Sequence, residues 1–180
     1  MKILAFTGMP FSGKSEAVKT AKEMNIPIIR MGDMIWEEAK NLELELNDKN
    51  VGTIASQMRE EHGKDIWARR ALEKLKSVEN MSFIVIDGIR NVEEIDLFKK
   101  YLEGNFVVVA VKASDKTRQK RALTRNREDD SNNVENVKER DRRELRWGLG
   151  VVIASADVVV SNEGGIEEFR DKVRKILDGI

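Results

Sequence analysis

The stretch ILAFTGMPFSGKS, residues 3–15, decides the fold that this chain can adopt. It begins with a continuous apolar run, residues 3–6, which is typical of a strand covered on both faces. Residues 8–15 then match the pattern G-x-x-x-x-G-K-[ST]. Glycines in such a loop let backbone N–H groups turn inward around phosphate oxygens, and the N-terminus of the next helix adds partial positive charge. Strand, loop and helix in this order predict a phosphate-binding loop.

Four more apolar runs of strand length follow, and each is again continuous rather than alternating. They cover residues 26–29, 83–86, 106–111 and 158–160. Helical patterns are predicted over residues 14–24, 33–42, 51–61, 65–78, 93–102, 115–125, 134–147 and 166–177. This alternation predicts an α/β fold of three layers, a P-loop fold with about five parallel strands flanked by helices.

The composition excludes several kinds of site. The chain has no cysteine, so it has no disulfide framework, thiolate metal site or thiol nucleophile. Lys plus Arg and Asp plus Glu both number 32, and this zero net charge does not favour a general nucleic-acid binder, without excluding one. No apolar run approaches the roughly 20 residues that a membrane span needs. We expect a cytoplasmic protein without a membrane segment, and the sequence leaves its oligomeric state open.

The phosphate loop assigns a donor site by its chemistry. We expect its backbone to cradle the phosphates of ATP, Lys14 to reach the β and γ phosphates, and the hydroxyl of Ser15 to bind Mg²⁺. Asp87 ends an apolar strand, where an acid would hold the Mg²⁺ shell or, alternatively, cap the next turn. Arg90 follows at the edge of the sheet where ligands bind, as an acceptor ligand or as a surface ion pair. The predicted nucleotide-binding residues are Gly8, Ser12, Gly13, Lys14, Ser15 and Glu16.

Two stretches are not explained by simple strand–helix–strand units. Residues 33–78 supply about three helices between the second and third strands, and residues 125–136 are polar and charged. At 180 residues the chain suits one domain. We therefore expect a single kinase-like domain, with residues 33–78 as a helical insertion that binds the acceptor and residues 125–136 as a lid.

Three segments resemble nucleoside monophosphate kinases. They are residues 8–15, then Met31-Gly-Asp-Met-Ile35, then Ile86-Asp-Gly-Ile-Arg90. Adenylate kinases carry T-G-D-[ML]-[LI]-R and D-G-F-P-R at the last two places. Residues 156–164, ADVVVSNEG, are more like dephospho-coenzyme A kinase. Both features together, with the segments REEHG at 59–63 and RWG at 146–148, resemble archaeal adenylate-kinase-related proteins over nearly the whole chain.

The resemblance implies a five-stranded parallel sheet, an acceptor insertion and a lid that bears arginines. It also implies that the loop from Asn162 to Gly164 flanks the adenine, and that the acceptor lies against Gly32, Asp33, Trp36 and Arg90. The sequence departs from adenylate kinase in the acceptor segments. Met31 replaces a threonine, Trp36 replaces the arginine that would hold the acceptor phosphate, and the proline before Arg90 is missing. These departures leave the donor site intact and the acceptor open.

Two groups of arginines flank the expected lid. Arg121 and Arg125 are four residues apart, so they share a helix face, and we expect them to clamp the transferring phosphoryl group. A solvated charged helix is the alternative. Arg140, Arg142, Arg143 and Arg146 form the second group, and one of them is expected to reach phosphate.

Other residues are open to more than one interpretation. His62 is the only histidine, and a structural or solvated role is favoured over catalysis. Trp36 and Trp67 would stack on an acceptor base or, more simply, pack in the core. Asp33 would cap its helix, contact the acceptor, or act as the base if the acceptor is a hydroxyl.

The sequence thus predicts an ATP- and Mg²⁺-dependent phosphotransferase acting on a small molecule, a nucleoside monophosphate or related nucleotide. Dephospho-coenzyme A kinase is one alternative. A P-loop ATPase that serves as a nucleotide-dependent switch for a macromolecular partner is another. The sequence does not decide between ATP and GTP as the donor. No guanine-reading N-K-x-D motif is present, and this absence favours adenine only weakly.

Overall fold

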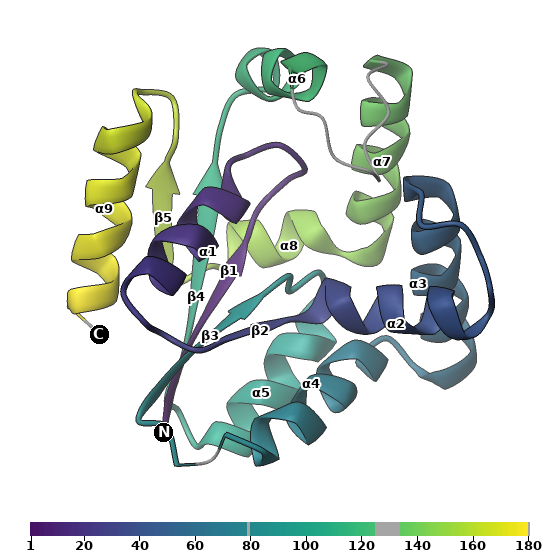
Figure 1. Cartoon of the computed structure of the whole chain (residues 1–180), viewed down its shortest axis with the longest axis horizontal. Helices are drawn as coiled ribbons and strands as arrows, with labels where there is room; N and C mark the ends of the chain where they lie inside the picture. Colours follow the sequence, from purple (N-terminus) through teal and green to yellow (C-terminus); the bar gives the residue numbers. More distant parts are fainter. Residues whose placement is uncertain (79, 125–133, 180) are drawn as a thin grey trace.

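A computed structural model describes residues 1–78, 80–124 and 134–179. Its centre is a parallel sheet of β1 (Lys2–Thr7), β2 (Ile28–Arg30), β3 (Phe83–Asp87), β4 (Phe106–Lys112) and β5 (Val158–Ser161). The strand order is β2-β3-β1-β4-β5 (Figure 1). All of the paired strands run parallel, so the predicted α/β fold with a five-stranded parallel sheet is confirmed.

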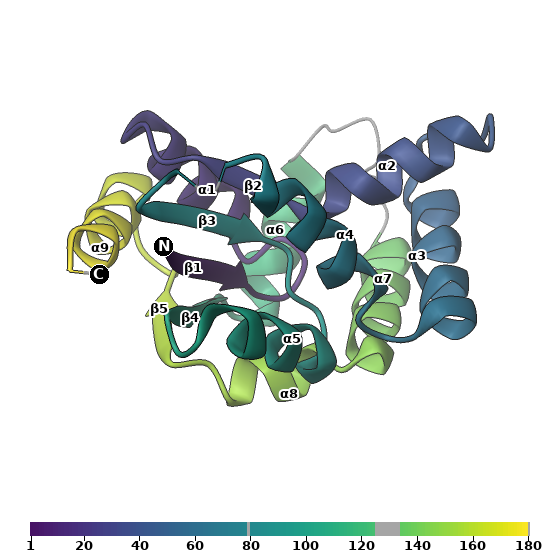
Figure 2. The same ribbon diagram turned by 90° about the horizontal axis from the view of Figure 1, so that it is seen from below.

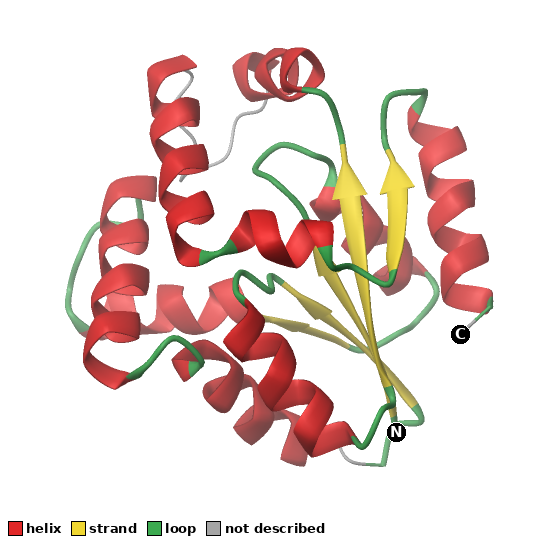
Figure 3. Ribbon diagram, turned by 180° about the vertical axis from the view of Figure 1, so that it is seen from behind, coloured by secondary structure: helices red, strands yellow, loops and turns green. Residues whose placement is uncertain are grey.

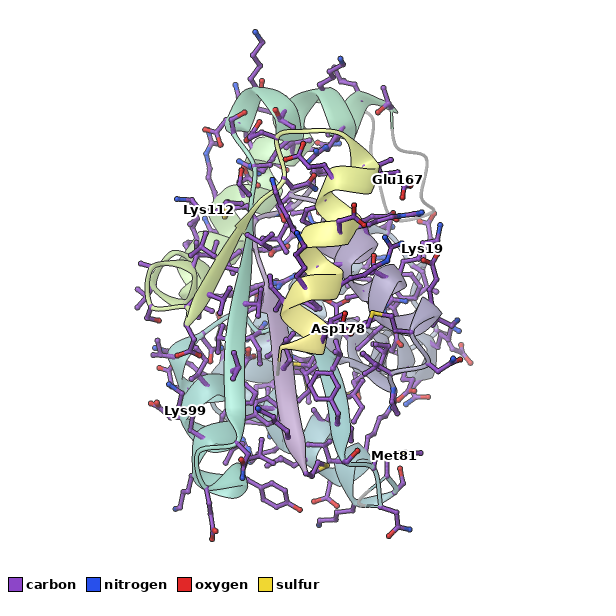
Figure 4. All side chains as sticks on the ribbon, turned by 90° about the vertical axis from the view of Figure 1, so that its left-hand side faces the viewer. Lys19, Met81, Lys99, Lys112, Glu167 and Asp178 are labelled. Atoms are coloured by element: carbon purple, nitrogen blue, oxygen red, sulfur yellow. The ribbon has the colours of Figure 1, made fainter. Side chains whose placement is uncertain are left out.

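One face of the sheet packs against α1 (Lys14–Glu23) and α9 (Ile166–Asp178). Because successive side chains of a strand point to opposite faces, Leu4 and Phe6 of β1 belong to this core. Figure 4 shows α9 along this face, with Glu167 toward the same end of the molecule as Lys112 and with Met81 at the opposite end.

The other face packs against α4 (Ile66–Lys76), α5 (Val92–Leu102) and α8 (Leu149–Ala154). Ile3 and Ala5 of β1 point into this core, as the alternation requires. Figure 2 shows α5 and α8 on the side of the sheet away from α1. The apolar runs of the strands are continuous because both faces are covered.

The remaining helices gather beyond the carboxyl ends of the strands. They are α2 (Met31–Asn41), α3 (Asp48–His62), α6 (Asp115–Thr124) and α7 (Val134–Trp147). In Figure 3 the arrowheads of β4 and β5 point toward the end that carries α6. Figure 2 shows α2, α3 and α7 beyond the arrowheads of β1 and β3. Three helices, α2 to α4, do lie between β2 and β3 in the chain.

The element boundaries differ from the predicted ones at a few places. β2 begins after Pro27, whose carbonyl accepts a hydrogen bond from Val85 and whose missing N–H cannot join the ladder. Helix α8 was not predicted, because a segment of six residues is too short for a helical period to be recognised. Of the expected lid, residues 125–133 lie outside the described residues, and residues 134–136 belong to α7. Among the described residues, no helix combines the length and apolar character needed to cross a membrane.

The packing of α9 on the sheet makes a simple test of this architecture. Phe169 is 1% exposed, so Phe169→Ala should lower the free energy of unfolding by about 3–5 kcal/mol through the cavity it leaves. Tyr101→Ala is the matched aromatic control, since Tyr101 is 42% exposed, and it should cost less than about 1 kcal/mol. Denaturant unfolding followed by circular dichroism gives both values. Equal losses in the two variants would contradict the placement of α9.

Candidate functional site

The adjacency of β1 and β3 brings the phosphate loop to Asp87. In the register of the two strands Phe6 lies opposite Asp87, so the loop that follows β1 leaves the sheet beside that carboxylate. Lys14, the first residue of α1, donates a hydrogen bond to Asp87 and forms an ion pair with it. Arg30, the last residue of β2, places its Nε 3.7 Å from the other carboxylate oxygen. Three neighbouring strand ends therefore converge on one acid.

The pKa values of this pair follow from burial and from the surrounding cations. Burial lowers the pKa of Lys14 and the nearby Arg90 lowers it further, against the opposing effect of Asp87. Burial alone would raise the pKa of Asp87, but Lys14, Arg90 and Arg30 outweigh it and hold that pKa below its ordinary value. Asp87 is thus a carboxylate at neutral pH, which is the form that a metal ion or its water shell needs.

The loop itself has the shape of an anion cradle. Gly13 has φ +101°, and a Cβ there would overlap the side chain of Asn162, so this position requires glycine. The buried hydroxyl of Ser12 has no hydrogen-bond partner among the described residues. A buried donor of this kind is expected to have an acceptor in the functional state. The loop geometry and this hydroxyl fit a bound phosphate.

A cleft extends from the loop toward α3 and α7, and we call it the main cleft. It is lined by the loop from Gly8 to Ser15, by the start of α2, by the turn after β3 and by side chains of α3 and α7. Its basic and acidic lining residues are Lys14, Arg30, Arg59, Arg90, Arg140, Arg143, Asp33, Asp48, Asp87 and Glu144. Basic residues outnumber acidic ones in this lining, so the cleft suits an anionic ligand.

The arginines of the main cleft are held by two carboxylates, the buried Glu144 and the partly buried Asp48. Arg90 places its Nε 2.7 Å from Glu144, and Arg140 donates to the same carboxylate at 3.2 Å. Arg143 donates to both oxygens of Asp48 at 2.8 Å. Burial would raise the pKa of Glu144, but Arg90 and Arg140 reverse this and lower it. The guanidinium groups are therefore pre-positioned before any ligand binds.

Arg59 is the most buried arginine of the main cleft. Its guanidinium donates to Glu94 at 3.1 Å and stacks 4.5 Å from the ring centre of Trp147. Glu94 is fully buried, and this burial raises its pKa despite the charge of Arg59. The stack joins α3 to the end of α7, and both of its residues line the main cleft.

The structure separates the members of the second arginine group. Arg140 and Arg143 line the main cleft. Arg142 is 63% exposed at its side chain and pairs with Glu135, and Arg146 is also exposed. Phosphate contact from α7 would therefore come from Arg140 or Arg143.

The four residues predicted to bind the acceptor all line the main cleft. They are Gly32, Asp33, Trp36 and Arg90. Asp33 is about half exposed at its side chain and lies 3.6 Å from Arg30. Trp67 also borders the cleft but is fully buried and donates to the carbonyl of Ala55, so it is a core residue. His62 is half exposed, lines neither this cleft nor the next one, and lies 3.8 Å from Glu61.

A second cleft, the side cleft, opens on the other side of the loop. It is lined by Phe11, Gly13, Ser15, Glu16, Arg121, Thr124, Asn162, Gly164, Ile166 and Phe169. The side-chain amide of Asn162 donates to the carbonyl of Ser12 at 2.9 Å, which fixes this loop against the phosphate loop. Glu16 borders the side cleft while its carboxylate pairs with Arg170 at 2.6 Å. The predicted nucleotide-binding residues are thus brought together in two adjoining clefts.

Of the two arginines predicted to clamp the transferring group, only Arg121 lies within the described residues. Arg121 lines the side cleft, and its guanidinium donates to the carbonyls of Ser12 and Asn162 at 3.1 and 2.9 Å. Its role as a clamp on the transferring group stays a prediction. Arg125 lies outside the described residues.

Sequence reasoning missed Arg59, Glu94 and Glu144 as members of the site. The signal was present, because each is a charged residue on the apolar face of its helix. Arg59 follows Ala55 by one turn, and Glu94 precedes Phe98 by one turn. Their partners are distant in the chain, so the sequence does not show which charges meet.

The lowered pKa of Glu144 predicts a pH dependence of stability. Its folded pKa lies below the ordinary value of 4.5, so its stabilisation is present above that value and is lost as the pH falls through the folded pKa. Glu144→Gln removes the charge that Arg90 and Arg140 share as an ion-pair partner, and it should cost about 3 kcal/mol at neutral pH. It should also flatten the fall of stability below about pH 5. Unfolding curves at a series of pH values measure both effects.

The control for this test is Glu139→Gln, an exposed substitution on the same helix. It should keep the wild-type acid profile. An unchanged acid profile in Glu144→Gln would show that Glu144 is not the carboxylate that couples folding to pH here.

Comparison with known proteins agrees with this geometry. A family model described as an AAA domain matches residues 7–138. The UPF0200/UPF0201 protein of Archaeoglobus fulgidus is 42% identical over 178 residues, which are 98% of this chain and 55% of that protein. The chain thus spans about half the length of that relative. The UPF0200 protein of Methanosarcina barkeri is 40% identical over 98% of this chain and 95% of its own length.

Solved structures show the same fold at low sequence identity. TT1252 from Thermus thermophilus superposes with a TM-score of 0.64 at 17% identity, over 99% of this chain and 97% of that one. Shikimate kinase from Aquifex aeolicus gives a TM-score of 0.52 at 17% identity, over 98% and 96% of the two chains. With these likenesses and with relatives 40% identical along almost its full length, the chain belongs to the UPF0200 family and carries an AAA domain with a P-loop kinase fold.

Proposed function

We propose that this protein is an ATP-dependent phosphotransferase that moves the γ-phosphoryl group to a small anionic acceptor, a nucleoside monophosphate or a related nucleotide. One observation carries the proposal. The phosphate loop stands between two clefts. The cleft that contains Lys14 and Asp87 is also lined by four arginines, which we call the arginine wall: Arg59, Arg90, Arg140 and Arg143. A hydrolase would not need an anion-binding wall on the far side of its phosphate loop.

The donor half of the site rests on the loop and the side cleft. Backbone N–H groups of residues 8–15, with Lys14, would hold the phosphates, and the hydroxyl of Ser12 would gain its missing partner. The base would lie in the side cleft, beside Arg121, Asn162 and Gly164. This cleft has an apolar wall in Ile166 and Phe169, which suits a flat ring.

Mg²⁺ fits the residues at the junction of the clefts. Ser15 borders both clefts, and Asp87 is held as a carboxylate by the cations around it. These two residues would hold the ion, which when bound neutralises charge on the donor phosphates. The chain's own contribution is to keep Asp87 ionised and to direct Lys14 toward the same point.

The acceptor half rests on the arginines of the main cleft. Arg90 and Arg143 present guanidinium groups whose carboxylate partners fix their orientation, so a planar anion would meet donors that are already aligned. These groups, with Arg59 and Arg140, would replace the arginine that adenylate kinases have where this chain has Trp36. Trp36 itself is half-buried and would offer a ring for stacking.

A hydroxyl acceptor, as in dephospho-coenzyme A kinase, is the second candidate. It is favoured by Asp33, whose half-exposed carboxylate lines the main cleft on the same side as Asp87. A hydroxyl needs a base to remove its proton, whereas a phosphate oxygen does not. The two candidates therefore differ in what they require of Asp33.

The proposal is tested first by turnover with a panel of acceptors. Purified protein with Mg²⁺ and ATP or GTP is given AMP, the other nucleoside monophosphates, dephospho-coenzyme A or no acceptor. We expect one acceptor to raise release of the nucleoside diphosphate many-fold and to become phosphorylated. Slow release that is indifferent to every acceptor would contradict the phosphotransferase and favour a partner-dependent ATPase.

Lys14→Ala should lower that turnover by at least about a hundredfold, because it removes the cation nearest the transferring phosphates. Lys19→Ala is the matched control on the same helix, since Lys19 is 57% exposed and pairs only loosely with Glu23. Circular dichroism confirms that both variants are folded. Near-normal turnover in Lys14→Ala would overturn the donor site.

Asp33→Asn separates the two kinds of acceptor. If the acceptor is a hydroxyl, transfer should fall by about a hundredfold or more while the dissociation constant for ATP is unchanged. If it is a phosphate, transfer should persist with at most a change in the KM for the acceptor. Calorimetric titration of ATP against both proteins supplies the binding control.

A further inference from the structure

The phosphate loop is held from outside by the helices α6 and α7. Phe11, at its tip, has φ 61°, a left-handed backbone conformation that is uncommon for a non-glycine residue. Its ring is 8% exposed and packs with Ala122 of α6 and Val137 of α7. The tip of the loop is therefore inserted between two helices that follow it by more than a hundred residues in the chain.

The carbonyl groups on either side of Phe11 both accept hydrogen bonds from α6. Arg118 donates to the carbonyl of Pro10 at 3.0 Å, and Arg121 donates to that of Ser12 at 3.1 Å. A loop that turns its N–H groups inward must turn carbonyl groups outward, and buried carbonyls need donors. The two arginines, three residues apart on one helix, supply these donors.

Arg118 is fixed more firmly than an ordinary surface arginine. Its side chain is 6% exposed and donates to both oxygens of Asp141 on α7, at 2.9 and 2.8 Å. Asp115 is a further partner at 2.7 Å but is itself 83% exposed. Burial would lower the pKa of Arg118, and the carboxylates of Asp141 and Asp115 more than offset it, so the pKa is raised. One guanidinium thus links α6, α7 and the phosphate loop.

From this arrangement we infer that Arg118, together with Asp141, is a positioning residue for phosphate binding. The pair lines neither the main cleft nor the side cleft, so it acts through the loop rather than by touching a ligand. It holds the carbonyl of Pro10 outward and thereby maintains the strained conformation of Phe11 on which the inward N–H groups depend. The inference rests on the proposed function in one respect, namely that the loop binds nucleotide phosphates.

The mechanism has a signature that a purely structural role lacks. Because Arg118 bonds to the phosphate loop and lines neither cleft, its loss should weaken the binding of inorganic pyrophosphate and of ATP by the same factor. Loss of a residue that acted through the side cleft would weaken the binding of ATP and leave the binding of pyrophosphate unchanged, because pyrophosphate has no base. A residue that merely stabilised the fold would lower the melting temperature and leave both dissociation constants unchanged in the folded protein.

The test uses Arg118→Lys and Asp141→Asn in the full chain. Lysine keeps the charge but cannot bond to Pro10 and to both oxygens of Asp141 at once. Titration calorimetry with Mg²⁺-ATP and with pyrophosphate should show dissociation constants about tenfold higher for Arg118→Lys, with the same factor for both ligands. Asp141→Asn should act in the same direction with a smaller factor. Arg174→Lys on α9 is the control, because Arg174 is 40% exposed and pairs only within its own helix.

Hydrogen exchange in the ligand-free protein gives a second readout that does not depend on nucleotide binding. Amides of residues 11–15 should exchange several-fold faster in both variants than in the wild type, while those of β1 and β4 stay protected. Wild-type protein that binds neither ligand would refute the proposed function, and faster loop exchange in the variants would still support the positioning role. Unchanged loop exchange, or dissociation constants within twofold of the wild type, would overturn the inference.

Discussion

The ion pair between Lys14 and Asp87 depends on a single topological fact, that β1 and β3 are neighbours in the sheet. Both strands are buried on both faces, so their register is fixed by packing and Phe6 must lie opposite Asp87. The loop after β1 and the acid at the end of β3 then leave the sheet side by side. The other parts of the site surround that point, with α2, α3 and α7 lining one cleft and the loop after β5 lining the other together with α6 and α9.

The features that could be predicted from the sequence are those written in local patterns. The residue types of the loop at positions 8–15 are those that phosphate binding requires, so the loop could be recognised from them. The continuous apolar runs predicted the parallel sheet. The residues that the resemblance to adenylate kinases assigned to the acceptor follow β2 and β3, whose carboxyl ends must share one edge of the sheet, and all of them line the main cleft. Their contact with an acceptor stays a prediction. These inferences needed no knowledge of how the helices pack.

The arginine wall could not be predicted in the same way. Arg59 and Trp147 stack on each other although 88 positions separate them in the chain, and Glu144 meets Arg90 across 54 positions. Which of the arginines on α7 faces inward depends on how that helix is rotated against α3. Helix α7 has so many charged residues that its apolar face cannot be recognised from the sequence. Arg118 lies on a densely charged helix, and its partners Pro10 and Asp141 are 108 and 23 positions away from it in the chain.

Burying the charged groups of the site costs free energy of folding. Glu94, Glu144 and Asp87 are nearly removed from solvent, and each is compensated by a basic residue on another element. Apolar side chains of similar size would often be at least as stabilising as such pairs. Their value is orientation, because a guanidinium held by a buried carboxylate cannot turn away when the cleft is empty.

Gly13 and Ser15 border both clefts, so one short piece of backbone forms the partition between them. Two ligands bound in the two clefts would approach this partition from opposite sides, and neither would obstruct the entry of the other. Such an arrangement suits direct passage of a group between two molecules held together, in either order of arrival. It has no need of a relay through a modified side chain, and the half-exposed His62 stands away from both clefts.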